Sequence, residues 1–296
     1  MILKIKMKDY KKKYIDISDS MNKESENPLK VSYIFQDNTE SKKKNCPIIL
    51  IHGLFASIFS WRNNVDVLSR HNPIYALDLK GHGNSDKPKN SDYSPMALTL
   101  FIREFMNYLE IKKAVFVGNS LGGGISLLMA LKFPSLVSKL VLLAPACYKQ
   151  SLPSYIRKLK NPLLRIPFYF FSSKSIIQQV LPRVYFDNRL ITEEVINGYS
   201  APLNLKGTKS AFVALAKGLI PSDIDDIEKQ VPTIKHKTLI IWGEEDRIIP
   251  LALAKRLHQE ISHSTLHIIP QCGHAPQEEK PEIVNSLVTD FLKKES

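Results

Sequence analysis

Cysteine is scarce in this chain of 296 residues. The three cysteines, Cys46, Cys147 and Cys272, are odd in number and widely spaced. This count and spacing predict neither a disulfide framework nor a CxxC metal site. We expect the three side chains to fill space in the core of a protein that works in a reducing compartment.

Long apolar runs are also missing. The longest, such as 47–51 and 139–146, are far shorter than the roughly 20 residues that a membrane-spanning helix requires. The N-terminus alternates lysine with apolar residues and lacks the continuous apolar stretch of a secretory signal. A cytoplasmic location is therefore the working expectation.

Acidic residues are outnumbered, since 29 Asp and Glu stand against 41 Lys and Arg, for a net charge of +12. Such a charge suits nucleic acid or an anionic membrane surface. The basic residues are dispersed, however, and no helix-turn-helix, zinc-finger or RNP-like pattern accompanies them, so we expect no nucleic-acid partner.

A hydrophobic content of 44% is sufficient for a folded protein with a hydrophobic core.

Short apolar runs alternate with amphipathic segments over residues 47–145 and again over 237–294. This alternation predicts an α/β core, in which helices cover both faces of a mostly parallel sheet. The expected strands are 47–52, 73–79, 113–119, 138–144, 237–243 and 264–270, preceded by 12–18 and 31–36. The expected helices are 95–110, 121–133, 251–261 and 281–293.

The alternation stops between the two halves, where prolines break the chain into short helical pieces. We therefore expect residues 1–146 and 233–296 to form the core, and residues 147–232 to form a helical insertion, a cap, between two strands of its sheet.

The strongest local signal is an apolar strand that runs into Gly118-Asn119-Ser120-Leu121-Gly122 and then into an apolar helix. A strand that turns abruptly into a helix strains the turn residue, and glycine neighbours let the two elements approach. The serine oxygen then lies at the N-terminus of the helix, where N–H groups favour negative charge. Ser120 is therefore the candidate nucleophile. The simpler alternative is a glycine-rich turn that only packs the helix on the sheet.

Serine is a weak nucleophile that needs a base, usually a histidine held by a carboxylate. His274 follows the last expected strand, and Asp246 lies in the loop after the preceding strand. The chain order Ser, Asp, His matches the order of this elbow motif. Glu244 and Glu245 compete with Asp246 for the role of the carboxylate, and we favour Asp246.

Several ordered motifs resemble those of the α/β-hydrolase fold family. They include the loop 52–55 and the turn 78–85, which is similar to the D-x-x-G-x-G-x-S loop of the family. The resemblance implies that Leu54 and Leu121 supply the backbone N–H groups of an oxyanion hole. It also implies that the insertion is a cap over the site, and that an acyl-enzyme forms without a cofactor or a metal.

Other polar side chains near these loops have simpler expected roles. Asp78 and His82 are expected to stabilise their turn, and His52 to hydrogen-bond the loop backbone. The histidines expected at the surface, because they fall across a helix, a turn and a strand, are His258, His263 and His267.

The first part of the insertion is basic and aromatic. Residues 149–183 contain seven Lys or Arg and no Asp or Glu, interleaved with leucines and the run 168–171. Such a stretch suits an anionic membrane interface, or admits a hydrophobic chain past a charged head group. The simpler explanation, which we favour at this stage, is that the aromatics form the core of the cap. We expect Phe55, Phe168 and Tyr169 to contact substrate.

The sequence thus predicts a serine hydrolase that cleaves a small-molecule acyl or aryl ester, with a lipid chain only weakly preferred. A carbon–carbon bond hydrolase of meta-cleavage-product type, a thioesterase or a lactonase would use the same residues. From another class, a ligand receptor that keeps the triad also resembles this pattern. Dehalogenases and epoxide hydrolases of the family carry aspartate at the nucleophile position, so Ser120 argues against both.

Overall fold

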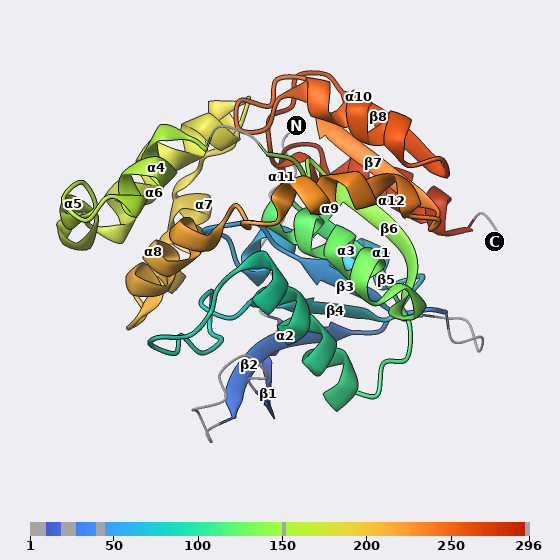
Figure 1. Ribbon diagram of the computed structural model, residues 1–296, viewed down its shortest axis with the longest axis horizontal. Helices are drawn as coiled ribbons and strands as arrows, with labels where there is room; N and C mark the ends of the chain where they lie inside the picture. Colours follow the sequence, from blue (N-terminus) through green and yellow to red (C-terminus); the bar gives the residue numbers. More distant parts are fainter. Residues whose placement is uncertain (1–9, 19–27, 40–44, 150–151, 294–296) are drawn as a thin grey trace.

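One sheet of eight strands organises the computed structural model (Figure 1), which describes residues 10–18, 28–39, 45–149 and 152–293. Along the sheet the strands follow the order β1-β2-β4-β3-β5-β6-β7-β8. β2 pairs antiparallel with β1 and β4, and every other neighbouring pair is parallel. The strands are β1 (Lys13–Ile17), β2 (Leu29–Gln36), β3 (Ile48–Ile51), β4 (Ile74–Leu77), β5 (Ala114–Asn119), β6 (Val137–Leu143), β7 (Thr238–Gly243) and β8 (Ser264–Ile269). The predicted α/β fold with a mostly parallel sheet is confirmed.

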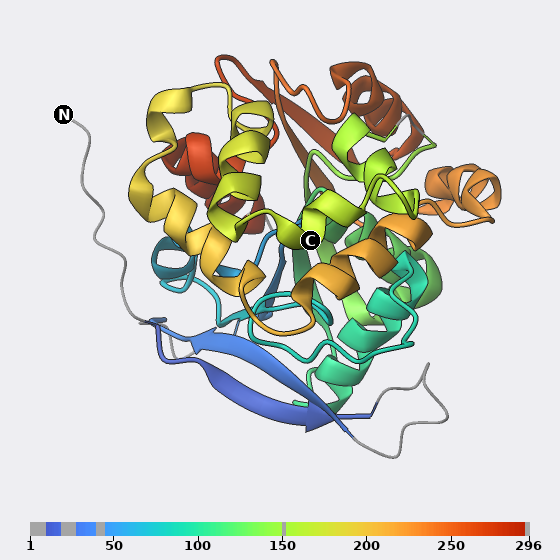
Figure 2. The ribbon, with the colours of Figure 1, turned by 90° about the vertical axis from the view of Figure 1, so that its left-hand side faces the viewer.

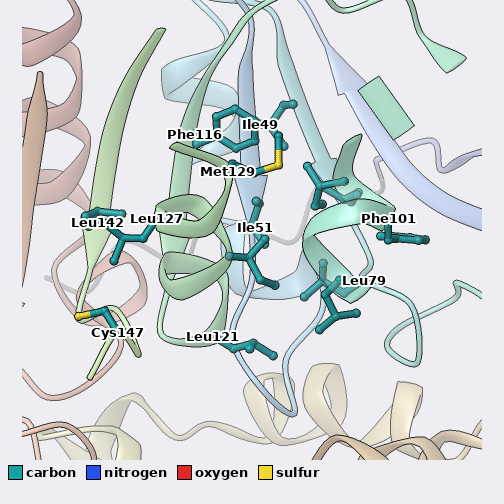
Figure 3. Close-up of a cluster of buried hydrophobic side chains, with 14 of the residues drawn as sticks. Ile49, Ile51, Leu79, Phe101, Phe116, Leu121, Leu127, Met129, Leu142 and Cys147 are labelled. Atoms are coloured by element: carbon teal, nitrogen blue, oxygen red, sulfur yellow. The ribbon is translucent and has the colours of Figure 1, made fainter. Parts of the chain in front are cut away.

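The central strands are apolar along their whole length because both of their faces are covered. On β5, Val115 and Val117 point to one hydrophobic cluster, and Ala114 and Phe116 point to the other. Figure 3 shows the second cluster, where Phe116 and Ile49 meet side chains of the covering helices. This double burial explains why continuous apolar runs located the strands to within two residues.

Helices of the core cover the two faces. The core helices are α1 (Val65–Leu68), α2 (Pro95–Tyr108), α3 (Leu121–Lys132), α10 (Leu251–Glu260), α11 (Pro276–Glu279) and α12 (Pro281–Lys293). α2, α3 and α10 belong to one cluster, whereas α1 and α12 belong to the other. The helix predicted over 95–110 ends at Tyr108, because Glu110 takes a left-handed backbone with φ 54°.

The insertion between β6 and β7 consists of short helices, as the prolines indicate. They are α4 (Ser154–Lys160), α5 (Ile166–Phe170), α6 (Ser173–Val184), α7 (Glu193–Leu203), α8 (Thr208–Gly218) and α9 (Ile224–Gln230). α4 packs on α8 and α6 on α7, at one end of the molecule (Figures 1 and 2). The division into a core of 1–146 and 233–296 and a cap of 147–232 stays a prediction.

Two further observations bear on the surface and the core. No helix in the described ranges combines the length and the apolar character needed to cross a bilayer. All three cysteines are free thiols, and Cys147 and Cys272 are buried, which fits the expected role as core fillers.

Candidate active site

Ser120 lies in a strained turn between β5 and α3. Its backbone has φ 54° and ψ −117°, a left-handed conformation that non-glycine residues rarely adopt. A Cβ added at Gly122 would overlap the carbonyl oxygen of Ile51, and one at Gly118 would overlap that of Gly122. The steric reason given for these glycines is therefore confirmed, since a side chain at either position would push the helix off the sheet.

The carboxylate of Asp246 holds the ring of His274. Asp246 Oδ2 lies 2.8 Å from His274 Nδ1, and the two side chains are 0% and 7% exposed. Asp246 Oδ1 accepts the backbone N–H groups of Ile248 and Ile249 at 2.7 and 2.9 Å. These bonds fix the position of the carboxylate. The Nδ1 contact makes Nε2 the ring nitrogen that remains for the serine.

The neighbouring acids do not reach His274. Glu245 Oε2 accepts the N–H of Cys272 at 2.9 Å, and Glu244 is exposed. The structure therefore brings Asp246, the acid favoured from the sequence, to the imidazole.

Ser120 and His274 line the same cavity. Within the described ranges no hydrogen bond joins the Ser120 hydroxyl to the imidazole. Contacts of this kind commonly shorten only when substrate binds, so the geometry is compatible with a nucleophile and its base.

The loop of His274 is tied to both the elbow and the insertion. Asn119 Nδ2 donates to the carbonyl oxygen of His274 at 3.1 Å, and the N–H of His274 donates to the carbonyl oxygen of Val184 at 2.8 Å. Glu279 accepts the N–H groups of Gly273 and Phe186 at 2.8 and 2.7 Å. Burial raises the pKa of Glu279, while these donors oppose the shift. Two residues of the insertion, Val184 and Phe186, thus help to position the histidine.

Leu54 and Leu121 line the same cavity. Leu121 is the first residue of α3, where an N–H has no acceptor within the helix. Leu54 follows Gly53, and a Cβ added at Gly53 would lie 3.2 Å from the Cβ of Ser120. The next residue, Phe55, has a left-handed φ of 61°. Leu54 and Leu121 therefore lie at the cavity that Ser120 lines, and the oxyanion hole formed by their N–H groups stays a prediction.

The cavity walls are mainly apolar. Leucine, isoleucine and valine side chains of α3 from the core, and of α4, α6 and α9 from the insertion, enclose it. Besides His274, the ionisable side chains on the wall are Tyr148, Tyr155, Tyr199, Cys147 and Glu278; none of the described lining residues is a lysine or an arginine. The cavity thus offers no cation to a negatively charged substrate.

Of the three residues expected to contact substrate, Phe55 lines the cavity, whereas Phe168 and Tyr169 do not. Phe168 packs against the cores of both the insertion and the protein, with the ammonium of Lys209 5.9 Å from the centre of its ring. Tyr169 is 41% exposed and borders a separate depression beside Ser91. Prolines around this short helix hide its periodicity, so the sequence pattern does not indicate which aromatic side chain faces inward.

A buried polar cluster borders the cavity wall at Glu278. Arg62 forms an ion pair with Glu278 Oε2, which also accepts the Tyr185 hydroxyl at 2.8 Å, while Tyr199 donates to Oε1. Burial alone would lower the pKa of Arg62, but the Glu278 carboxylate and the two phenols raise it above its usual value. No sequence pattern indicates this cluster, because Arg62 and Glu278 lie 216 residues apart in the chain.

The turn 78–85 has the structural role expected for it. Asp78 accepts the N–H groups of Ile58 and Asn84, each at 2.9 Å. His52 Nδ1 donates to the Gly53 carbonyl oxygen at 2.8 Å, and its Nε2 accepts the N–H of Leu79 at 3.1 Å. Both ring nitrogens of His52 are therefore occupied by backbone, and this histidine does not serve as a base.

Acid is expected to destabilise the protein through two buried histidines. Burial lowers the pKa of His52 and of His82 from 6.5, the value expected in the unfolded chain. The unfolded state therefore binds protons more readily, and stability is lost as the pH falls below about 6.5, by at most about 1.4 kcal/mol per pH unit for each histidine. Urea unfolding of the wild type and of His82→Phe between pH 5 and 8 measures this slope. Parallel pH curves for the two proteins would contradict the assignment.

Known proteins resemble this chain in sequence and in fold. A family model described as alpha/beta hydrolase fold matches residues 47–173 and 171–281. The uncharacterised hydrolase YugF of Bacillus subtilis is 35% identical over 247 residues, which are 83% of this chain and 89% of that protein. The 2-hydroxy-6-oxo-2,4-heptadienoate hydrolase of Pseudomonas putida is 29% identical over 255 residues, covering 84% and 90%.

A solved structure extends the comparison to three dimensions. The meta-cleavage product hydrolase CumD of Pseudomonas fluorescens IP01 superposes with a TM-score of 0.75 at 27% identity. The match covers 90% of this chain and 95% of that protein. The similarity therefore includes the insertion as well as the sheet.

Proposed function

Because this chain belongs to the alpha/beta hydrolase fold family, we propose that it hydrolyses neutral carboxylic esters with an apolar acyl or aryl group. In this proposal Ser120 is the nucleophile, His274 is the base and Asp246 holds the imidazole. The backbone N–H groups of Leu54 and Leu121 form the oxyanion hole.

The mechanism has two halves. His274 accepts the proton of the Ser120 hydroxyl while the serine oxygen attacks the ester carbonyl, and the two backbone N–H groups stabilise the resulting oxyanion. His274 then gives that proton to the leaving alcohol, which departs and leaves an acyl-serine. Water attacks the acyl-serine with His274 again as base, and this step releases the acid and restores the enzyme.

The observation that carries the substrate class is the charge of the cavity wall. Ser120 and His274 open onto apolar side chains, and no described lining residue is a lysine or an arginine. A carboxylate on the substrate would lose its hydration there without gaining a cation, which costs several kcal/mol. Glu278 lies on the same wall, but Arg62 pairs with it, so this ion pair supplies no free cation to a substrate carboxylate.

Carbon–carbon bond hydrolysis is the second candidate, and the relatives favour it. The Pseudomonas putida relative is named for a dienoate, a substrate that carries a carboxylate. The described basic residues of the insertion that point outward, such as Lys158 and Lys160, do not line the cavity. For this reason the ester is the better fit to this chain.

A matched pair of substrates tests the proposal. p-Nitrophenyl butyrate and the p-nitrophenyl monoester of succinic acid share a leaving group and have acyl chains of equal length, but only the second carries a carboxylate. We expect kcat/KM for the butyrate to be at least about a hundredfold higher, because the cavity disfavours the charge by about 3 kcal/mol or more.

The control substrate is 2-hydroxy-6-oxo-6-phenylhexa-2,4-dienoate, which appears in the name of a Burkholderia cepacia relative. Faster turnover of this dienoate than of any ester would replace the ester proposal by carbon–carbon hydrolysis. Equal rates for the butyrate and the succinate would show that the cavity charge does not select the substrate.

A further inference from the structure

An exposed surface that is both apolar and basic lies on α4, on α5 and on the turn between them. Its members are Arg157, Lys158, Lys160, Leu163, Leu164, Ile166, Phe170 and Phe171, and we name it the α4–α5 surface. We propose that this surface docks on an anionic lipid bilayer. The proposal goes beyond ester hydrolysis and does not depend on it.

The apolar side chains are concentrated in one short segment. Eleven large hydrophobic residues of the described chain are exposed, and six of them fall within residues 163–171. Phe170 is 84% exposed and Leu163 is 75% exposed. Single exposed hydrophobic residues are ordinary, but a contiguous cluster marks a surface that meets another molecule or a membrane.

The segment is held in a fixed orientation. Lys209 donates to the carbonyl oxygens of Tyr169 and Phe171 at 3.1 and 2.7 Å, and Phe168 packs inward against the hydrophobic clusters. The aromatics therefore divide into one anchor and an outward-facing group. The simpler explanation, that they all form the core of the insertion, does not account for Phe170 and Phe171.

The charges of the surface are positive and unopposed. Arg157, Lys158 and Lys160 follow one another along the outer side of α4, and no ion pair within the described ranges engages them. Residues 149–183 contain no acid at all. Basic residues placed beside exposed apolar ones match a bilayer that offers anionic head groups above an apolar interior.

A second copy of this chain is a poorer occupant. A chain with a net charge of +12 would bring like charges together at a two-fold interface. An anionic bilayer instead offers negative head groups to the basic residues of the surface and an apolar interior to its hydrophobic residues.

The position of the surface suits docking on a plane. α5 lies at the left-hand extremity of the molecule in Figure 1, and the same end faces the viewer in Figure 2. The opposite side of α4 presents Tyr155 and Ile156 to the cavity of Ser120. Docking would therefore place one wall of the cavity next to the lipid.

Vesicle sedimentation tests the proposal in the full chain with Ser120→Ala, so that no lipid is hydrolysed. The probes are vesicles of phosphatidylcholine alone and vesicles that also contain phosphatidylglycerol. We expect binding to the anionic vesicles only. Lys158→Ala with Lys160→Ala should weaken it at least about tenfold, because each basic residue near the membrane contributes roughly a fivefold factor. Leu163→Ser with Phe170→Ser should weaken it by a similar factor, because it removes the apolar anchor.

Two control variants match these changes elsewhere on the molecule. Lys112→Ala with Lys113→Ala removes two exposed lysines at the start of β5, the end of the strand opposite Ser120. Tyr108→Ser with Ile283→Ser removes two scattered exposed hydrophobic residues. Both controls should bind vesicles within about twofold of the parent protein, and circular dichroism should show all variants folded.

Three results would overturn the proposal. The first is that the parent protein does not bind anionic vesicles. The second is that the control variants lose as much binding as the variants of the α4–α5 surface, because net charge alone would then explain the binding. The third is concentration-dependent self-association in sedimentation velocity that Phe170→Ser abolishes, because the surface would then be an interface between copies of this chain.

Discussion

Replacing Ser120 or His274 with alanine is expected to lower kcat for p-nitrophenyl butyrate by at least about a thousandfold. Without Ser120 no acyl-enzyme can form, and without His274 the hydroxyl keeps its proton. The two residues act as a unit, so kcat of the double variant should be at most about threefold lower than kcat of either single variant. Steady-state kinetics at pH 8 measures all three proteins.

The carboxylate provides a matched control for this first prediction. Asp246→Asn keeps the shape of the side chain but removes the charge that holds the tautomer of His274, and kcat should fall by about 10⁴-fold. Glu244→Gln changes an exposed acid in the same loop and should leave kcat within about twofold. A fluorophosphonate should label Ser120 in the wild type and not in Ser120→Ala. Full activity in either alanine variant would overturn the proposed site.

The second large effect is expected on stability, when the ion pair of Arg62 and Glu278 is broken. Their side chains are 13% and 1% exposed. Glu278→Leu leaves a buried guanidinium without its carboxylate, and we expect the free energy of unfolding to fall by about 3–5 kcal/mol. Replacing both partners, as Arg62→Met with Glu278→Leu, should recover at least about 2 kcal/mol of that loss, because no charge then remains buried.

Urea unfolding of the two single variants and the double variant closes the cycle. The exposed pair of Lys174 and Glu193, with side chains 47% and 69% exposed, serves as the control. Glu193→Gln should cost at most about 1 kcal/mol. Additive losses for Arg62→Met and Glu278→Leu would mean that the two residues stabilise the protein independently and not as a pair.

Local patterns were sufficient for the sheet and the elbow. Strands such as β5 and β7 are buried on both faces, so each one is a continuous apolar run that is legible without knowing its neighbours. The strain at Ser120 and the contacts that exclude a side chain at Gly118 and Gly122 also arise between neighbouring elements. For this reason the strained turn at Ser120 was predictable from five consecutive residues.

Predicting the proposed partners of Ser120 needed one further rule. The carboxyl ends of parallel strands meet at one edge of the sheet, so loops after β7 and β8 bring Asp246 and His274 together although 28 residues separate them. Sequence alone left Glu244 and Glu245 as competitors. Only the fold shows that the Glu245 carboxylate accepts a hydrogen bond from the backbone N–H of Cys272 and does not reach His274.

The sequence by itself determined the fold class, the elbow at Ser120 and the chain order of the residues around it, because these depend on local burial and local steric contact. The tertiary structure alone decided the charge of the cavity and the direction of each side chain of the insertion. Arg62 and Glu278 meet across 216 residues, and Phe168 turns inward while Phe170 turns outward on a helix of five residues. Such outcomes depend on which distant surfaces pack together, and a short proline-interrupted segment has no periodicity that records them.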